Sequence, residues 1–212
     1  MLCLNESLVA ERNPTSSVAE SVRSLRVYIR QHLRESKGGT VLLLTSAHEG
    51  EGKSVLVANL AVSFAQEGRK TCVVDGNLRN PSLHLIYDLN NGHGLTDYLI
   101  GNEEAENIVR PCGTPGLSVI TAGEAPPNPS ELLGSERMEK LFVKLRQEYE
   151  IILLDSPNVL DFSDARVLAA RTDGAVLVVK YGRSKREAVR KAKQYMDQAG
   201  VSVLGIAMNQ VK

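Results

Sequence analysis

The sequence predicts an α/β protein with a doubly wound, mainly parallel sheet and an N-terminal helix. Short apolar runs rich in Val, Ile and Leu recur along the 212 residues without polar alternation, as in strands that are buried on both faces of a parallel sheet. Helix-length segments separate most of these runs, and this alternation is typical of doubly wound folds. A glycine-rich segment, "SAHEGEGKS", joins the first run to the helix-length segment after it.

The individual elements follow from these patterns in chain order. One helical face over residues 17–34 is predicted by apolar residues at spacings of three and four, which are Val18, Val22, Leu25, Ile29 and Leu33. The predicted strands are "TVLLLTS", "TCVVD", "LSVIT", "IILLDS", "GAVLVVK" and "SVLGIAMN". The helices expected between them cover residues 54–67, 136–148, 163–171 and 184–199. Residues 76–116 interrupt the alternation, and this long interval predicts short helices and loops.

The composition limits the class of protein. With 42% hydrophobic residues, we expect one domain over residues 17–212 after an N-terminal segment, residues 1–16. The 25 basic and 25 acidic residues cancel, so no overall field favours nucleic acid or an anionic membrane. Three cysteines without metal-binding spacing favour a reduced, cytosolic chain. The apolar runs are shorter than the roughly 20 residues of a membrane span, so a membrane role would need a partner.

The glycine-rich segment matches the phosphate-loop pattern except at its first position, Ala47. Because it lies between a predicted strand and a predicted helix, we favour the P-loop NTPase fold over a simple glycine-rich turn with a surface lysine. Backbone N–H groups and the helix N-terminus can cradle phosphate oxygens, Lys53 can bridge the β- and γ-phosphates, and Ser54 can serve Mg²⁺. The predicted nucleotide-binding residues are Glu49, Gly50, Glu51, Gly52, Lys53, Ser54 and Val55.

Two carboxylates end apolar runs, Asp75 after "TCVV" and Asp155 after "IILL". The C-terminal ends of parallel strands line the ligand crevice, so both are expected to face the phosphate loop. Either residue alone could merely cap a turn. Together they predict a site in which Asp155 holds Mg²⁺ and Asp75 lies near enough to accept a proton from an attacking hydroxyl. The predicted metal-side residues are Ser54, Asp75, Asn77 and Asp155.

With these motifs in place, the chain resembles the bacterial protein-tyrosine kinases of capsule and exopolysaccharide synthesis, a branch of the deviant phosphate-loop ATPases that also includes septum-site and partition ATPases. The resemblance runs from about residue 16 to residue 212. Its carriers are "AESVRSLR", "TSAHEGEGKS", "VVDGNLRNP", "GLTDYLIGN", "TAGEAPPNPSELLGS", "YEIILLDSPNVLDFSDARVLA" and "GIAMNQVK". The segment "PPNPSELLGS" and the motif around Asp75 are the most discriminating of these.

The resemblance implies ATP and Mg²⁺ as cofactors and transfer of the γ-phosphoryl group to tyrosine hydroxyls. It implies that Lys53 clamps phosphate, that Ser54 and Asp155 serve the metal, and that Asp75 is the catalytic base. The family's second motif usually has a second carboxylate where this chain has Asn77, which keeps the shape of the metal-side residue and removes its charge. The family also usually ends in a tyrosine-rich tail, whereas this sequence stops at "NQVK", so phosphorylation on such a tail is not expected here.

The resemblance further implies partners. Glu20, Arg23 and Arg26 match positions that join neighbouring subunits in a ring, although a solvated charged helix face is the alternative. We expect a transmembrane activator that regulates polysaccharide chain length, protein tyrosine substrates, and a cytoplasmic location at the inner face of the membrane through that partner. The basic segment "YGRSKREAVRKAKQ" is interpreted as the polar face of a helix, with docking to a partner as the alternative. His32, His84 and His93 are interpreted as surface or packing residues.

Two functions remain open on the sequence alone. One is an ATP-dependent tyrosine kinase that regulates polysaccharide synthesis or export. The other is an assembly protein that binds MgATP, hydrolyses it slowly and lacks kinase activity. Asn77 and the absent tail favour the second function, and the remaining motifs favour the first.

Overall fold

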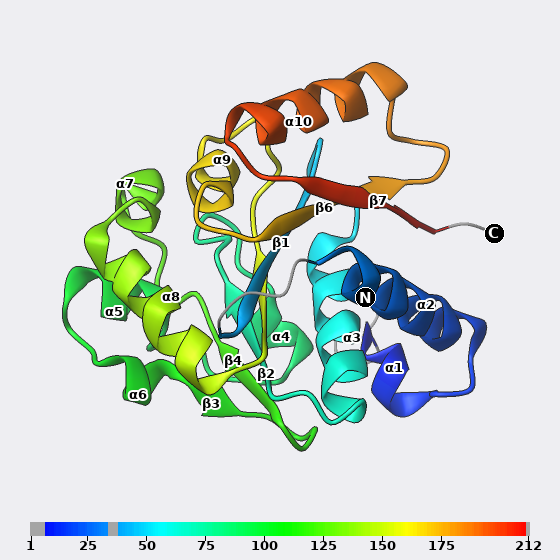
Figure 1. Ribbon diagram of the computed structural model, residues 1–212. Coiled ribbons are helices and arrows are strands. Elements are labelled where there is room, and N and C mark those ends of the chain that lie inside the picture. Colours follow the sequence, from blue (N-terminus) through cyan, green and yellow to red (C-terminus); the bar gives the residue numbers. More distant parts are fainter. Residues whose placement is uncertain (1–6, 34–37, 211–212) are drawn as a thin grey trace.

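A computed structural model describes residues 7–33 and 38–210. Its centre is a seven-stranded sheet with the order β3-β4-β2-β5-β1-β6-β7 (Figure 1), in which every pair is parallel except β3 with β4. The strands are β1 Thr40–Ser46, β2 Thr71–Asp75, β3 Arg110–Pro111, β4 Leu117–Ile120, β5 Ile151–Asp155, β6 Gly174–Lys180 and β7 Val203–Asn209. The predicted α/β fold and its six strands are confirmed. The two-residue β3 was not predicted, because so short a pairing leaves no apolar run.

Helices cover both faces of the sheet, and each face has its own core (Figure 1). One face packs against α1 Val9–Arg12, α2 Ser17–His32, α3 Lys53–Gln66 and α4 Leu83–Ile86. The other face packs against α5 Leu95–Ile100, α6 Ala105–Ile108, α7 Pro129–Leu133, α8 Glu136–Glu148, α9 Asp164–Ala169 and α10 Arg186–Gln198. Central strands such as β1 and β5 are therefore buried on both sides, which explains why their sequences are apolar without alternation.

The helix boundaries agree with local capping signals. The side chains of Ser16 and Ser135 accept hydrogen bonds from N–H groups in the first turns of α2 and α8, as serine does at helix starts. The interval 76–116 holds the short helices α4, α5 and α6, as the sequence predicts. The five-residue α7 lies within "PPNPSELLGS" and was not predicted, because one helical turn gives no measurable period.

The α1 helix lies inside the predicted N-terminal segment and is attached to α3. Asn59 of α3 accepts the N–H of Ala10 at 2.8 Å, and its amide donates to the carbonyl of Ser7 at 2.6 Å. Gln66, the last residue of α3, donates to the carbonyl of Ala10 at 3.2 Å. Residues 7–12 therefore pack with the domain, while a functional boundary near residue 16 stays a prediction.

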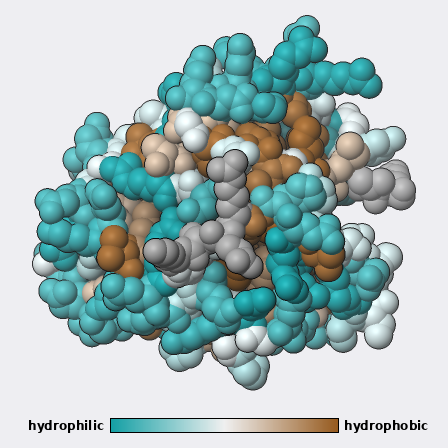
Figure 2. Space-filling view, viewed as in Figure 1, coloured by the Kyte–Doolittle hydropathy of each residue, from teal (hydrophilic) through white to brown (hydrophobic). Residues whose placement is uncertain are grey.

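The molecular surface in this view is mainly hydrophilic, with hydrophobic residues gathered beside β6 and β7 (Figure 2). The edge strand β7 contributes Ile206 and Met208, each more than half exposed. Among the described helices, none combines the length and the apolar character that crossing a bilayer requires. The C-terminal ends of β1, β2 and β5 meet at one edge of the sheet, and the predicted site residues lie there.

Candidate active site

The loop between β1 and α3 forms a cradle at this edge of the sheet. Gly50 and Gly52 have φ angles of 75° and 86°, in the left-handed region where side chains cause strain. A Cβ atom on Gly52 would also lie 2.0 Å from Nδ2 of Asn209. The N-terminus of α3 has no side-chain cap, which leaves its first N–H groups for a ligand. Such an arrangement suits phosphate oxygens.

Lys53 and Ser54 begin α3 and point into the same site. Lys53 is only 7% exposed. Burial lowers the pKa of its ammonium group, and the carboxylates of Asp155, Glu51 and Glu49 oppose that shift. Ser54 donates its hydroxyl to Oδ2 of Asp155 at 2.5 Å. The end of β5 and the start of α3 are thereby joined through the two groups expected to hold Mg²⁺.

Asp75 and Asp155 close the adjacent strands β2 and β5, where they are register partners. Both are fully buried. Burial raises the pKa of the Asp75 carboxyl group, the charge of Asp155 raises it further, and backbone N–H groups of the following turn oppose the shift. Burial likewise raises the pKa of Asp155, against the hydroxyl of Ser54 and the charge of Lys53. Two neighbouring buried carboxylates repel each other unless a proton or a cation lies close to both.

The donor set at this edge fits Mg²⁺. This ion takes oxygen ligands, usually one or two carboxylates together with water and substrate phosphates. The hydroxyl of Ser54 and the carboxylates of Asp155 and Asp75 supply such oxygens. Over residues 7–33 and 38–210, no cluster of three or more His, Cys, Asp or Glu side chains forms a larger metal site. The protein would therefore supply part of the coordination shell, and a bound nucleotide would supply the rest.

Asn77 lies in the turn that follows Asp75. Its amide donates to the carbonyl of Asn80 at 2.9 Å, and its side-chain oxygen accepts the N–H of Asn80 at 3.3 Å. The Asn80 side chain donates to Glu49 of the phosphate loop at 2.8 Å. The Asn77 side chain is thus engaged within its own turn, and its place in the metal shell stays a prediction.

Comparison with known proteins identifies the group to which the chain belongs. A family model described as ParA, NUBPL iron-transfer P-loop NTPase, matches residues 38–211. The chain is 36% identical over 204 residues to the putative tyrosine-protein kinase CapB of Staphylococcus aureus, covering 96% of this chain and 89% of CapB. It is also 36% identical over 206 residues to the tyrosine-protein kinase YwqD of Bacillus subtilis, covering 97% of this chain and 86% of YwqD.

The chain belongs to the bacterial tyrosine-protein kinase family. Solved structures of this group have the same fold. The chimerical protein CapA2B2 matches with a TM-score of 0.93 at 32% identity, over 97% of this chain and 90% of that one. The kinase domain of the Escherichia coli tyrosine kinase ETK matches with a TM-score of 0.93 at 34% identity, over 97% of this chain and 80% of that one. The predicted kinase family and its nucleotide-binding P-loop fold are therefore confirmed.

The three residues predicted at a subunit contact, Glu20, Arg23 and Arg26, all lie on α2, but the contacts of Arg26 differ from those of the other two. Glu20 and Arg23 pair with each other on the exposed face, at 2.7 Å. Arg26 turns toward α3, where it donates to the carbonyl of Ser63 at 2.6 Å. Contacts inside the chain account for the position of Arg26, so Glu20 and Arg23 are the residues left facing solvent.

The side chain of Glu51, predicted as a nucleotide-binding residue, is engaged in hydrogen bonds inside the chain. Its carboxylate accepts the N–H of His48 at 3.1 Å and the hydroxyl of Ser184, in the connection between β6 and α10. Its carbonyl accepts Nδ2 of Asn209, at the end of β7, at 3.1 Å. Sequence reasoning missed Ser184 and Asn209 as supports of the phosphate loop, although "GIAMNQVK", which contains Asn209, was among the segments that carry the family resemblance. The half-buried Val55 packs against the core under the loop.

A second set of contacts missed by sequence reasoning joins three of the family-like segments. Arg79, in the turn after Asp75, donates Nε and a terminal nitrogen to the two oxygens of Asp164 at 2.7 and 3.1 Å. Ser130 of α7 donates its hydroxyl to the same carboxylate, which is fully buried. The guanidinium carbon of Arg79 lies 4.5 Å from the ring centre of Phe162. This network fixes the turn after β2 to α7 and α9.

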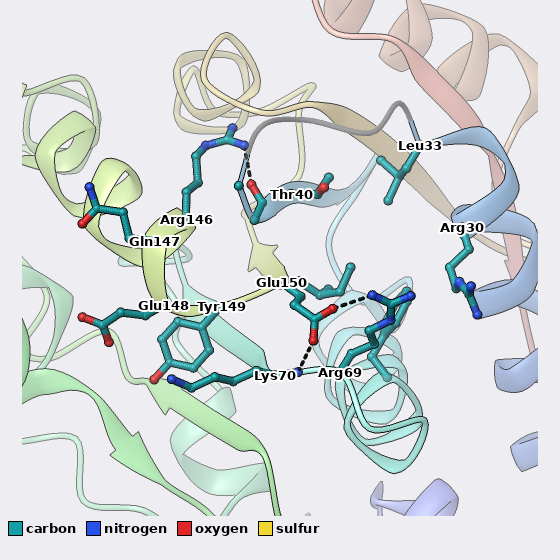
Figure 3. Close-up of a pocket in the computed structure, with 14 residues that line it drawn as sticks. Arg30, Leu33, Thr40, Arg69, Lys70, Arg146, Gln147, Glu148, Tyr149 and Glu150 are labelled. Carbon is teal, nitrogen blue, oxygen red and sulfur yellow. Dashed lines mark hydrogen bonds and ion pairs between the residues drawn. The ribbon is translucent and has the colours of Figure 1, made fainter.

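A large cavity lies at the other end of the sheet (Figure 3). Its volume is about 610 Å³, and residues at the starts of β1 and β5 line it, including Thr40. Arg69 in its wall pairs with Glu150, and Arg146 pairs with Asp173. These charges are neutralised in pairs, and the cavity is separated from the phosphate loop by the length of the sheet. The predicted catalytic residues Lys53, Asp75 and Asp155 do not line this cavity.

Proposed function

We propose that this chain transfers the γ-phosphoryl group of MgATP to tyrosine hydroxyls of proteins. The observation that carries the proposal is the pair of buried carboxylates, Asp75 and Asp155, side by side at the strand ends that adjoin Lys53 and Ser54. Curated relatives that cover nearly all of the chain are named tyrosine-protein kinases, which supports the same activity.

Each residue has a role that its position supports. The N–H groups of the phosphate loop and the ammonium group of Lys53 bind and orient the triphosphate. Ser54 and Asp155 hold Mg²⁺, which when bound supplies positive charge that offsets the charge developing on the phosphate oxygens. Asp75 accepts the proton of the tyrosine hydroxyl, since burial raises the pKa of its carboxyl group and so increases its basicity. Backbone N–H groups from Asn77, Ser82 and Leu83 hold that carboxylate in place.

A second function is favoured by one observation. Asn77 replaces the second carboxylate of the family motif, and its side chain forms hydrogen bonds with the backbone of Asn80 in the same turn. With less negative charge near the metal, the chain would bind MgATP and act by assembling on a partner, without transferring phosphate to tyrosine. A protein that binds MgATP but gives no phosphotyrosine would favour this alternative.

Transfer of radiolabel from γ-labelled ATP to protein tyrosine tests the proposal. The wild type should label tyrosine, and Lys53→Met should nearly abolish labelling because it removes the cation that follows the phosphates into the transition state. Circular dichroism of Lys53→Met should be unchanged, while titration with a fluorescent nucleotide should give reduced affinity. Wild-type nucleotide affinity in Lys53→Met would refute the assigned role of the phosphate loop.

The wider setting of the kinase rests on the family resemblance. We infer a role in polysaccharide synthesis or export, with a transmembrane activator that places the kinase at the inner face of the membrane. Self-association into a ring would use the exposed pair Glu20 and Arg23 on α2. The same radiolabel assay, repeated with and without the cytoplasmic part of a candidate activator, measures whether such a partner raises turnover.

A further inference from the structure

The connection between β6 and α10 contacts the phosphate loop through Ser184 and carries an exposed tyrosine. Tyr181 follows the last residue of β6 and is 58% exposed. This connection projects beyond the sheet at the right of the view in Figure 1. Because β6 runs parallel to β1, the connection leaves the sheet at the same edge as the phosphate loop.

The other tyrosines are held by contacts that Tyr181 lacks. They are Tyr28, Tyr87, Tyr98, Tyr149 and Tyr195. Tyr98 and Tyr149 are buried, and the ring of Tyr195, which is half-buried, lies under two cations. The hydroxyls of Tyr87 and Tyr28 donate to backbone carbonyls at 3.1 and 2.8 Å. Within the described chain, Tyr181 is the tyrosine that combines a mostly exposed ring with a hydroxyl free of hydrogen bonds.

Cations without a carboxylate partner flank Tyr181 along the chain. Lys180, Arg183, Lys185 and Arg186 have no carboxylate partner among the residues that the structure describes. A phosphate ester brings nearly two negative charges and three acceptor oxygens, and neighbouring cations stabilise it through charge-assisted hydrogen bonds. The connection is therefore suited to hold a phosphotyrosine once it has formed.

The same connection is bonded to the phosphate loop by two routes. The N–H of Tyr181 donates to the carbonyl of Asn209 at 2.9 Å, and the Asn209 side chain donates to the carbonyl of Glu51 at 3.1 Å. The hydroxyl of Ser184 accepts the N–H of Lys180 at 2.9 Å and donates to the carboxylate of Glu51. A change of charge at Tyr181 therefore acts on a segment that contacts the nucleotide cradle directly.

We propose that Tyr181 is the residue on which this kinase phosphorylates a second copy of its own chain, and that the phosphate weakens nucleotide binding. The proposal rests on the tyrosine kinase function proposed above. Transfer is between molecules, because β5 and β1 separate β6 from the strand of Asp75, a distance of roughly 14 Å at about 4.8 Å per strand.

The Tyr181 oxygen of one molecule forms a bond to the γ-phosphorus of ATP held by another, and the bond from that phosphorus to the β–γ bridging oxygen breaks. ADP leaves with the electron pair, and the hydroxyl proton passes to the carboxylate of Asp75. The new dianion adds negative charge to the connection whose Ser184 hydroxyl binds the Glu51 carboxylate, so repulsion within the phosphate-loop region lowers nucleotide affinity.

The test is to map phosphate by mass spectrometry after incubation with MgATP. Lys53→Met protein serves as the acceptor and wild type as the kinase, and a synthetic copolymer of glutamate and tyrosine is assayed in parallel. We expect phosphate on Tyr181 of the inactive acceptor, loss of that signal in acceptor that also carries Tyr181→Phe, and no loss with Tyr28→Phe as the matched control. Phosphorylated protein should bind a fluorescent nucleotide severalfold more weakly than the same protein after phosphatase treatment.

The results separate the two proposals. If the copolymer is phosphorylated while Tyr181 of the acceptor is not, or if Tyr28 carries the phosphate, the kinase function stands and the assignment of Tyr181 is wrong. If neither the copolymer nor the acceptor gains phosphate, the kinase function fails and the assignment falls with it. Nucleotide affinity unchanged by phosphorylation would overturn the proposed effect on the phosphate loop.

Discussion

Replacing Arg79 by alanine is expected to lower the free energy of unfolding, because it leaves the buried carboxylate of Asp164 without its ion-pair partner. The Asp164 carboxylate is fully buried, and the Arg79 side chain is 34% exposed. Removing one partner of a buried ion pair typically costs about 3–5 kcal/mol, because the remaining charge is left uncompensated. Ser130 would still donate to Asp164, so we expect the lower part of that range, about 3 kcal/mol.

The reverse change should cost less. In Asp164→Asn the charge that remains is that of Arg79, which can turn its guanidinium group into water, so we expect a loss of about 1–2 kcal/mol from the broken hydrogen bonds. Urea unfolding gives both values from the midpoint and the slope of the transition. For a domain of this size, about 3 kcal/mol corresponds to a fall in melting temperature of roughly 6–12 °C.

The pair Arg146 and Asp173 provides the matched control. Its carboxylate side chain is 25% exposed, so after Arg146→Ala water can solvate the charge, and the loss should be smaller than for Arg79→Ala. A loss below about 1 kcal/mol in Arg79→Ala, the usual range for exposed pairs, would refute the reasoning. So would a loss in Asp164→Asn that exceeds the loss in Arg79→Ala.

Three further changes test the site and the assembly. Asn77→Asp should raise turnover by up to tenfold, or about 1.4 kcal/mol of barrier, since a second carboxylate strengthens Mg²⁺ placement; unchanged turnover at saturating Mg²⁺ would show that Asn77 is not limiting. Burial raises the pKa of Asp155, so the native nucleotide-free protein binds this proton more tightly than the unfolded chain and loses stability as pH rises from about 4. The stability of Asp155→Asn relative to wild type should therefore increase with pH in urea unfolding, and a constant difference would contradict the shift. Arg23→Glu should give monomers in light scattering, because two acids then face a neighbouring subunit, whereas the swap of Glu20→Arg with Arg23→Glu keeps the pair and should stay assembled in MgATP. A monomeric wild type at micromolar concentration would exclude this contact.

Sequence patterns predicted the fold because its strands are apolar on both faces and end in recognisable residues. The position of each strand end follows from the last apolar residue before Asp75 or Asp155, and parallel pairing then places those ends at one edge of the sheet. The phosphate loop was predictable for the same reason, since its residues are consecutive in the chain. The strand ends and the phosphate loop could both be predicted because each depends on residues that are close together in the sequence.

The supports of the site could not be predicted in this way, because their contacts join residues far apart in the chain. Arg79 and Asp164 are 85 positions apart, and Glu51 and Ser184 are 133 positions apart. From the sequence alone, each of these residues is of a type that is common in surface turns or at helix starts. Their roles depend on which side chains the folded sheet brings into hydrogen-bonding distance, and no periodicity records that.

Helix geometry explains why the predicted contact on α2 divides into an outer and an inner part. Residues three positions apart differ by about 60° around a helix with 3.6 residues per turn, so six positions separate Glu20 from Arg26 by about 120°. Glu20 and Arg23 therefore share the exposed face. Arg26 faces α3 instead, where its guanidinium group contacts Ser63 and Glu67. Residues that repeat at every third position of a helix therefore drift around it and do not all lie on one face. An assembly assay based on Arg26 would consequently disturb the packing of α2 on α3 as well as any subunit contact, and only changes at Glu20 and Arg23 can separate the two effects.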